Sequence, residues 1–195
     1  LYVTRDTIPQ ILLLTGHDEL SGDLVASLSQ VLTGNNYSVS SVDLMAGGTL
    51  PPDALLMILS PRKDIASQEL EAIDAFARAG GALFITCDFT DDLEEMQNYL
   101  SLLRAYGMTP LQGVVVASGE EPDTYYGNTP LYLMPYLLSG DATASLLSSG
   151  MDRLILAGAR AFETPGATGA GLQVTPVLAS GYKAYLRDVF AGEVS

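Results

Sequence analysis

The chain has 195 residues, of which 23 are Asp or Glu and only 9 are Lys or Arg, so its formal net charge is −14. Hydrophobic residues make up 48% and charged residues 16%, a composition that excludes an intrinsically disordered chain. The scarcity of cations excludes a nucleic-acid binder, which needs a basic surface to displace counterions. A single cysteine, Cys87, excludes a disulfide scaffold. The sequence therefore predicts an acidic globular domain with a full hydrophobic core.

The first half of the chain carries five predicted strands. The apolar runs at residues 10–15 and 54–59 are typical of strands that are buried on both faces, and residues 82–86 predict a further strand. Residues 38–44 alternate with period two, as an outer or half-covered strand does. Residues 111–117 predict the strand that closes this half.

Amphipathic helices are predicted between these strands. Apolar residues recur at helical spacing from Leu24 to Leu32, and again between residues 93 and 106. A third helix is predicted from Ser67, as its N-cap, to Gly80, with Glu69 and Glu71 opposing the positive end of the helix dipole.

Strands that alternate with helices imply right-handed crossovers and a three-layer, doubly wound, mainly parallel α/β sheet. Residues 10–117 are predicted to form this βα core. Residues 118–195 predict an irregular C-terminal elaboration, in which residues 154–157 and 172–178 add strands to the sheet and residues 163–171 form a flexible loop. We expect residues 1–195 to form one α/β domain.

The order and spacing of several short motifs carry a family resemblance. A strand leads into Thr-Gly-His-x-Glu, an Asn-Tyr-x-Val strand ends in Asp-Leu, and Pro-x-Asp-Ala, Pro-x-x-Asp and Leu-Leu-x-x-Tyr-Gly follow. The residues concerned are Thr15, Gly16, His17, Glu19, Asn36, Tyr37, Val39, Asp43, Leu44, Pro51, Asp53, Ala54, Pro61, Asp64, Leu102, Leu103, Tyr106 and Gly107. The chain resembles the auxiliary domain of ABC-type transport systems, the gliding-motility (GldG-like) family, whose fold is related to the flavodoxin-like and class I glutamine amidotransferase-like folds.

The resemblance implies a non-catalytic module without a cofactor on the extracytoplasmic face of a bacterial cell membrane. It implies contact with the permease and ATPase subunits of an ABC transporter, and attachment to the membrane only through flanking transmembrane helices. A chain that begins at Leu1 rather than Met is expected for a piece cut from such a membrane-anchored protein.

His17 is the only histidine and follows the first predicted strand, at the edge where ligands of open α/β sheets bind. It is a candidate to bind an anion or to act as an acid or base. The alternative, which we favour, is a structural turn in which His17 satisfies local backbone groups. The further binding candidates near strand ends are Asp18, Glu19, Arg62 and Asp88.

Cys87 comes directly after the predicted strand at residues 82–86 and is followed by Asp88. A small-molecule-binding or hydrolytic enzyme of the amidotransferase-like class would pair Cys87 with His17, because a thiol nucleophile needs a neighbouring base. Thr86-Cys87-Asp88 lacks the glycines of a nucleophile elbow, and no second histidine supplies the His-x-Glu of that class. A buried inert thiol is therefore the favoured interpretation.

Three other clusters have structural interpretations. Asp91, Asp92, Glu94 and Glu95 crowd a helix start, where capping is favoured over Ca²⁺ binding, and no metal site is predicted. Glu120, Glu121 and Asp123 predict a solvated face. The glycine-rich residues 166–171 lack the Gly-Lys-Ser/Thr of a phosphate loop.

A tyrosine cluster follows residue 119. A tyrosine buries apolar area and keeps a polar hydroxyl, which suits an interface with a protein or a glycan. Packing of the C-terminal elaboration is an equally weighted alternative. The sequence also allows a third function, that of a ligand-free scaffold domain. The cluster comprises Tyr125, Tyr126, Tyr132 and Tyr136.

Overall fold

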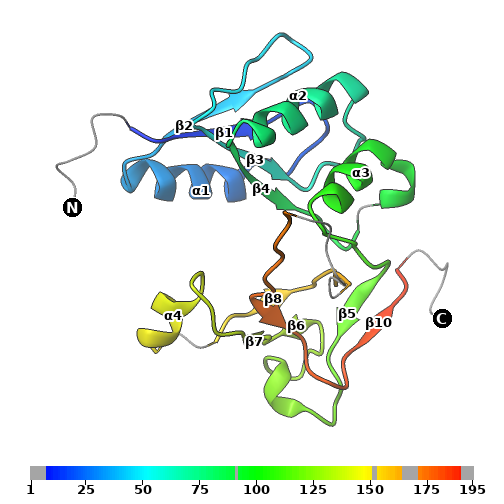
Figure 1. Cartoon of the computed structure of the whole chain (residues 1–195). Helices are drawn as coiled ribbons and strands as arrows, with labels where there is room; N and C mark the ends of the chain where they lie inside the picture. Colours follow the sequence, from blue (N-terminus) through cyan, green and yellow to red (C-terminus); the bar gives the residue numbers. More distant parts are fainter. Residues whose placement is uncertain (1–7, 91, 151–152, 164–170, 190–195) are drawn as a thin grey trace. The chain divides into compact units, whose positions relative to one another are not determined.

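The computed structural model describes residues 8–90, 92–150, 153–163 and 171–189 (Figure 1). The chain forms two compact units. The first comprises Leu1–Cys87 and Asp91–Leu102, and the second comprises Asp88–Thr90 and Leu103–Ser195. Each unit is described separately.

The first unit is built on a four-stranded parallel sheet with the order β2-β1-β3-β4. This order confirms the predicted doubly wound α/β fold of the flavodoxin-like kind. The period-two strand is the edge strand β2, as its half-polar pattern indicated, and the apolar runs occupy the other three positions. The strands are β1 (Gln10–Leu14), β2 (Ser38–Val42), β3 (Leu55–Leu59) and β4 (Ala82–Thr86).

Helices cover both faces of this sheet and complete the three layers (Figure 1). Helix α1 (Asp23–Gly34) lies on one face, and α2 (Ser67–Arg78) and α3 (Gln97–Ala105) lie on the other. Alternation of side chains along β1 and β3 supplies apolar residues to both faces. The cluster beneath α1 consists of Ile11, Leu13, Met57 and Leu59, packed against Val25, Leu28, Leu32, Val39 and Leu55.

The helix starts differ from expectation in their caps. Helix α2 begins at Ser67 but its N-cap is Ala66, so the predicted N-cap at Ser67 is wrong. Instead the Glu69 carboxylate reaches back and accepts a hydrogen bond from the Ala66 N–H at 2.9 Å. A carboxylate in the first turn can satisfy an otherwise unpaired donor as well as oppose the dipole.

The helix predicted between residues 93 and 106 is divided into a 3₁₀ turn, Leu93–Glu95, and α3. Asp92 caps the 3₁₀ turn by accepting a hydrogen bond from Glu94 N. Asp64, from a distant loop, accepts from the N–H groups of Asn98 and Tyr99 at the start of α3. Asp91, the fourth member of the acidic cluster, lies outside the described residues.

The described residues of the second unit form an irregular elaboration held by three antiparallel strand pairs. Strand β5 (Val114–Val116) pairs with β10 (Tyr185–Arg187). The other pairs have two residues in each strand: β6 (Tyr132–Leu133) with β8 (Leu156–Ala157), and β7 (Tyr136–Leu137) with β9 (Leu178–Ala179). A 3₁₀ turn (Pro122–Thr124) and the short helix α4 (Ala144–Ser148) complete this unit.

Three predicted placements of strands in the parallel sheet are wrong in this region. Residues 111–117 do not close the parallel half, because β5 pairs with β10 and not with the four-stranded sheet. Residues 154–157 and 172–178 add no strand to that sheet either. An apolar run in the sequence indicates a strand, but it does not identify the strand with which it pairs. Apart from Glu163 and Gly171, the predicted loop at residues 163–171, which includes the glycine-rich 166–171 segment, lies outside the described residues.

Candidate functional site

The carboxyl ends of β1 and β3 form the candidate site in the first unit. The chain leaves β1 toward α1 and β2 on one side, whereas β3 lies on the other side, so this edge is the topological switch point where open α/β sheets bind ligands. A hollow of about 430 Å³ lies there. Its walls come mainly from the loop between β1 and α1, together with Ser41 of β2 and Leu59 of β3.

His17 lies buried in this loop between two carboxylates. Its side chain contacts Glu19 Oε1 through Nδ1 at 2.9 Å and Glu69 Oε2 through Nε2 at 2.8 Å. The second Glu19 oxygen accepts a hydrogen bond from the His17 backbone N–H at 2.9 Å. His17 is 6% exposed and Glu69 is 2% exposed, so this cluster ties the loop after β1 to the start of α2 from inside the protein.

The two carboxylates determine the charge of the imidazole. Burial by itself lowers the pKa of His17, but hydrogen bonds and charge interactions with Glu19 and Glu69 outweigh it and raise the pKa above its ordinary value of 6.5. The protonated ring carries two N–H donors, one for each carboxylate. The ring of His17 therefore has no nitrogen left over to act as a general base.

A second set of contacts, at the surface, joins the loop after β1 to the loop between β3 and α2. The His17 carbonyl accepts hydrogen bonds from the backbone N–H groups of Arg62 and Lys63, at 2.8 and 3.0 Å. The Lys63 ammonium lies 2.8 Å from Asp18 Oδ2, and both side chains are exposed. Asp18 has φ 54°, an uncommon value for a residue with a side chain, so its carboxylate is presented from a constrained turn.

The structure thus brings four of the candidate residues together: His17, Asp18, Glu19 and Arg62 belong to these two loops. Asp18 and Glu19 line the hollow, whereas His17 lies behind its wall and not on its surface. Asp88 belongs to the second unit. There its carboxylate accepts hydrogen bonds from the backbone and hydroxyl of Thr90.

Glu69 and Lys63 are parts of this site that the sequence analysis missed. Glu69 stands 52 residues from His17, and its position in a first helical turn already had a sufficient explanation in the helix dipole. Its carboxylate is nevertheless the buried partner of the imidazole. The usable signal was the absence of Ser, Thr, Asp or Asn at position 66, which left the capping role to a side chain inside the helix.

His17 offers no unengaged ring nitrogen that could activate Cys87 as a nucleophile. Cys87 is half-buried, and both ring nitrogens of His17 are engaged by carboxylates. Within the part of the chain that the structure describes, no group of three or more His, Cys, Asp or Glu side chains could hold a metal ion. At this edge the contacts of His17 with Glu19 and Glu69 hold the loop after β1 against the start of α2.

The tyrosine cluster of the second unit has two roles. Tyr125 is half-buried and packs against the core cluster of Val115, Ala117 and Leu133. The other three members, Tyr126, Tyr132 and Tyr136, are exposed. Tyr136 lies near Tyr182, with ring centroids 6.5 Å apart. The sequence could not separate these roles because a tyrosine suits both a core and an interface.

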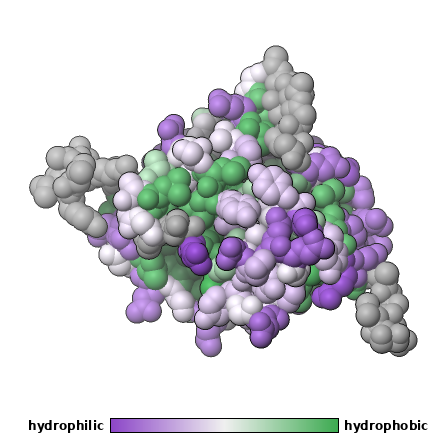
Figure 2. Space-filling view, turned by 90° about the horizontal axis from the view of Figure 1, so that it is seen from below, coloured by the Kyte–Doolittle hydropathy of each residue, from purple (hydrophilic) through white to green (hydrophobic). Residues whose placement is uncertain are grey.

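Apolar side chains are also exposed elsewhere in the second unit. The space-filling view of the molecule shows hydrophobic patches next to polar ones on the face that is seen from below (Figure 2). The exposed large aliphatic and phenylalanine side chains of this unit are Leu146, Leu154, Ile155, Phe162, Val177, Leu178, Leu186 and Val189. In the described residues no helix has the length and hydropathy needed to cross a membrane.

Comparison with known proteins adds a family and a fold. The family model described as "ABC-type uncharacterized transport system" matches residues 9–191. No curated protein matches the sequence. The chain is similar to the solved structure titled "mmIFT52 N-terminal domain", with a TM-score of 0.52 and 17% sequence identity.

That likeness covers 68% of this chain and 64% of the other chain. At this identity it shows a shared fold alone.

Proposed function

Because the family match spans residues 9–191, the chain belongs to the ABC-type uncharacterized transport system family, and we propose that it serves as a non-catalytic binding domain of that system. We place it on the extracytoplasmic face of a bacterial membrane, as in the GldG-like proteins that the sequence resembles. Flanking transmembrane helices would tether it to the permease and ATPase subunits.

One observation carries the non-catalytic part of the proposal. His17 is the only histidine of the chain, and Glu19 and Glu69 engage both of its ring nitrogens. A Cys–His mechanism needs an unengaged imidazole nitrogen beside the thiol to take its proton. The cluster instead stiffens the loop that lines the hollow, which favours a preorganised binding surface over a reactive site.

The charged rim of the hollow is the proposed contact surface. Asp18, which lines the hollow, forms an exposed ion pair with Lys63, and the preceding residue in the chain, Arg62, is also exposed. Exposed pairs contribute little to stability, so they are available to exchange partners at an interface. Charges on an interface rim act mainly on the association rate and on the choice of partner.

The test is co-purification of the tagged full-length protein with the permease and ATPase subunits of its transport system. We expect the subunits to co-purify, and Asp18→Asn, which removes the charge but tolerates φ 54°, to reduce their recovery without lowering the melting temperature. Asp53→Asn, at an exposed position of another loop, is the matched control. Failure of the wild-type protein to retain either subunit would contradict the proposal.

The membrane side has a separate test. In a Cys87→Ser background, Ser145→Cys places the one thiol of these 195 residues at an exposed position of α4. We expect a membrane-impermeant maleimide to label this thiol in intact cells. Labelling that requires permeabilised cells would place the domain on the cytoplasmic side instead.

A further inference from the structure

The segment that forms α1 and β2 has an unusual charge distribution for this chain. Residues 24–42 contain no Asp, Glu, Lys or Arg, although the protein carries 23 acidic residues and a net charge of −14. Asp23 and Asp43 bracket this uncharged segment. Depletion of charge is the compositional mark of an interface core, whereas the exposed surface of an acidic protein has no reason to lack charge.

The same segment contains an open sheet edge. Among the described residues, strand β2 is the last strand of the sheet and pairs only with β1. The Ser38 N–H donates to the Pro9 carbonyl, and the Val42 carbonyl accepts from Thr15 N, so residues 38, 40 and 42 turn their peptide groups toward β1. In a strand, neighbouring residues point these groups to opposite sides. Val39 and Ser41 therefore present their N–H and C=O groups at the open edge.

Nothing in β2 protects this edge from pairing. Natural edge strands are blunted by lysine, proline, a bulge or an inward-pointing charge. The sequence Ser-Val-Ser-Ser-Val has no lysine, no proline and no charge, and all five residues pair with β1 in unbroken register. Such an edge is a template for another strand.

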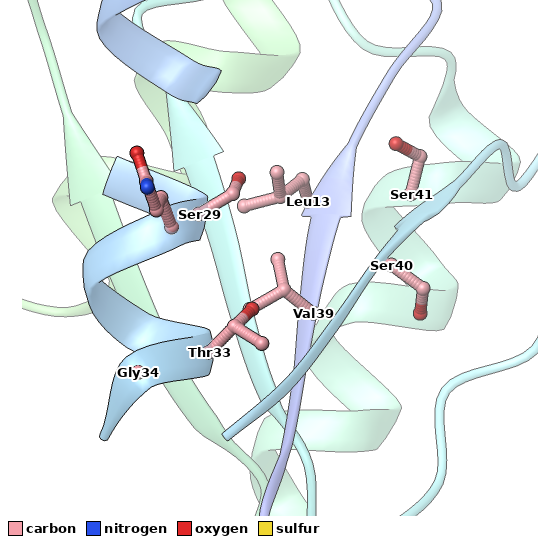
Figure 3. A pocket seen from close by; sticks show the side chains of 8 residues that line it. Leu13, Ser29, Thr33, Gly34, Val39, Ser40 and Ser41 are labelled. Carbon is pink, nitrogen blue, oxygen red and sulfur yellow. The ribbon is translucent and has the colours of Figure 1, made fainter. Parts of the chain in front are cut away.

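A hollow of about 560 Å³ lies beside the edge, between α1 and β2 (Figure 3). Ser29 and Thr33 of α1 line one side, and Val39 and Ser41 of β2 line the other, with Leu13 between them. All eight lining residues are uncharged. The space gives short side chains of an added strand a place on the α1 face of the sheet.

We propose that the occupant of this edge is β2 of a second copy of the chain, paired antiparallel about a two-fold axis that passes through Ser40. This register places Val39 opposite Ser41 of the second copy and Ser41 opposite Val39 of the second copy. Both are hydrogen-bonded pairs, because these residues already direct their peptide groups outward. The two sheets then form one continuous sheet across the axis.

The side-chain pairs and the charges favour this occupant. Each valine of β2 meets a serine, Ser40 meets Ser40, and no like charges lie opposite each other. Two molecules that each carry −14 can approach closely only through a face without charge. The carboxylates outside the patch are screened over a Debye length of about 8 Å at physiological salt. The association should therefore strengthen as salt is added.

The test is the oligomeric state of the 195-residue chain, measured by light scattering after gel filtration and by sedimentation equilibrium. We expect a reversible dimer with a dissociation constant on the order of micromolar, at about 0.15 M salt. Ser40→Lys and Ser40→Glu each place like charges face to face on the two-fold axis. We expect each variant to weaken the dimer by 100-fold or more.

An equimolar mixture of the two variants should restore the dimer, because Lys and Glu then face each other across the axis. Ser145→Lys, on exposed α4, is the matched control and should leave the dimer unchanged. Circular dichroism and the melting temperature verify that the variants fold. A wild-type chain that stays monomeric, or a mixture that fails to pair, would overturn the proposal.

Discussion

At the scale of single residues, the main feature of the candidate site is one buried imidazole that lies between two carboxylates. His17 connects the loop after β1, through Glu19, with the start of α2, through Glu69. A buried charge is costly unless partners satisfy it. Among the described buried side-chain atoms, Glu69 Oε1 has no hydrogen-bond partner, so the cluster depends on the contacts made by the other oxygen.

The His17 cluster predicts a loss of stability in alkaline solution. Folding raises the pKa of His17. The stabilisation that the protonated imidazole gives the folded state is therefore complete below the unfolded pKa of about 6.5, and it is lost as the pH rises through the folded pKa. Urea unfolding across pH 6 to 9 should show this decrease in the free energy of unfolding. In His17→Gln that step should vanish, and a wild-type profile in the variant would disprove the assignment.

Glu69→Gln tests the buried partner. The amide keeps the shape of the side chain but removes its charge, so one charge-assisted hydrogen bond is lost and the pKa of His17 falls. We expect a loss of about 1.5–3 kcal/mol in the free energy of unfolding. Glu71→Gln, at an exposed position of the same helix, should change the stability by less than about 0.5 kcal/mol.

At the scale of elements, the strands and helices of the first unit follow their sequence patterns closely. Strand β4 has the predicted bounds, and the period-two pattern of β2 indicated an outer strand. The pairing of β5 did not follow from its sequence. Three buried valines indicate a strand, and long-range contacts with β10 decide where that strand is placed.

The β5–β10 pair depends on one glycine. Gly113 has φ +98°, and a Cβ added there would lie 2.5 Å from the Arg187 carbonyl oxygen. Gly113→Ala should therefore lower the free energy of unfolding by about 1–3 kcal/mol through backbone strain. It should also speed hydrogen exchange at Val114–Val116. Gly119→Ala, where a Cβ meets nothing within 4 Å, is the control. Equal effects of the two substitutions would contradict this account.

At the scale of the whole molecule, two units of different construction share one chain. The first has a four-stranded parallel sheet with five-residue strands, and the second is held by strand pairs of two or three residues. Stability within a protein varies with the extent of buried and paired structure. That residues 1–195 form a single domain stays a prediction. It can be tested by asking whether the two units unfold together.

Hydrogen exchange measured by mass spectrometry at increasing urea gives that test. We expect peptides from residues 111–187 to lose protection at lower urea than peptides from residues 10–86, because their strands are shorter. Coincident loss of protection in both sets would show instead that the chain unfolds as one cooperative domain.

The sequence by itself determined the α/β class, the parallel core of the first unit and the carboxyl edge as the place to look for a site. These follow from periodicity and from turn residues, which act over a few neighbouring positions. Only the tertiary structure decided that Glu69 completes the His17 cluster, that β5 leaves the parallel sheet and that the tyrosines divide between core and surface. Each of these depends on contacts between residues far apart in the chain, and no local pattern encodes which distant partner satisfies a buried charge or a strand edge.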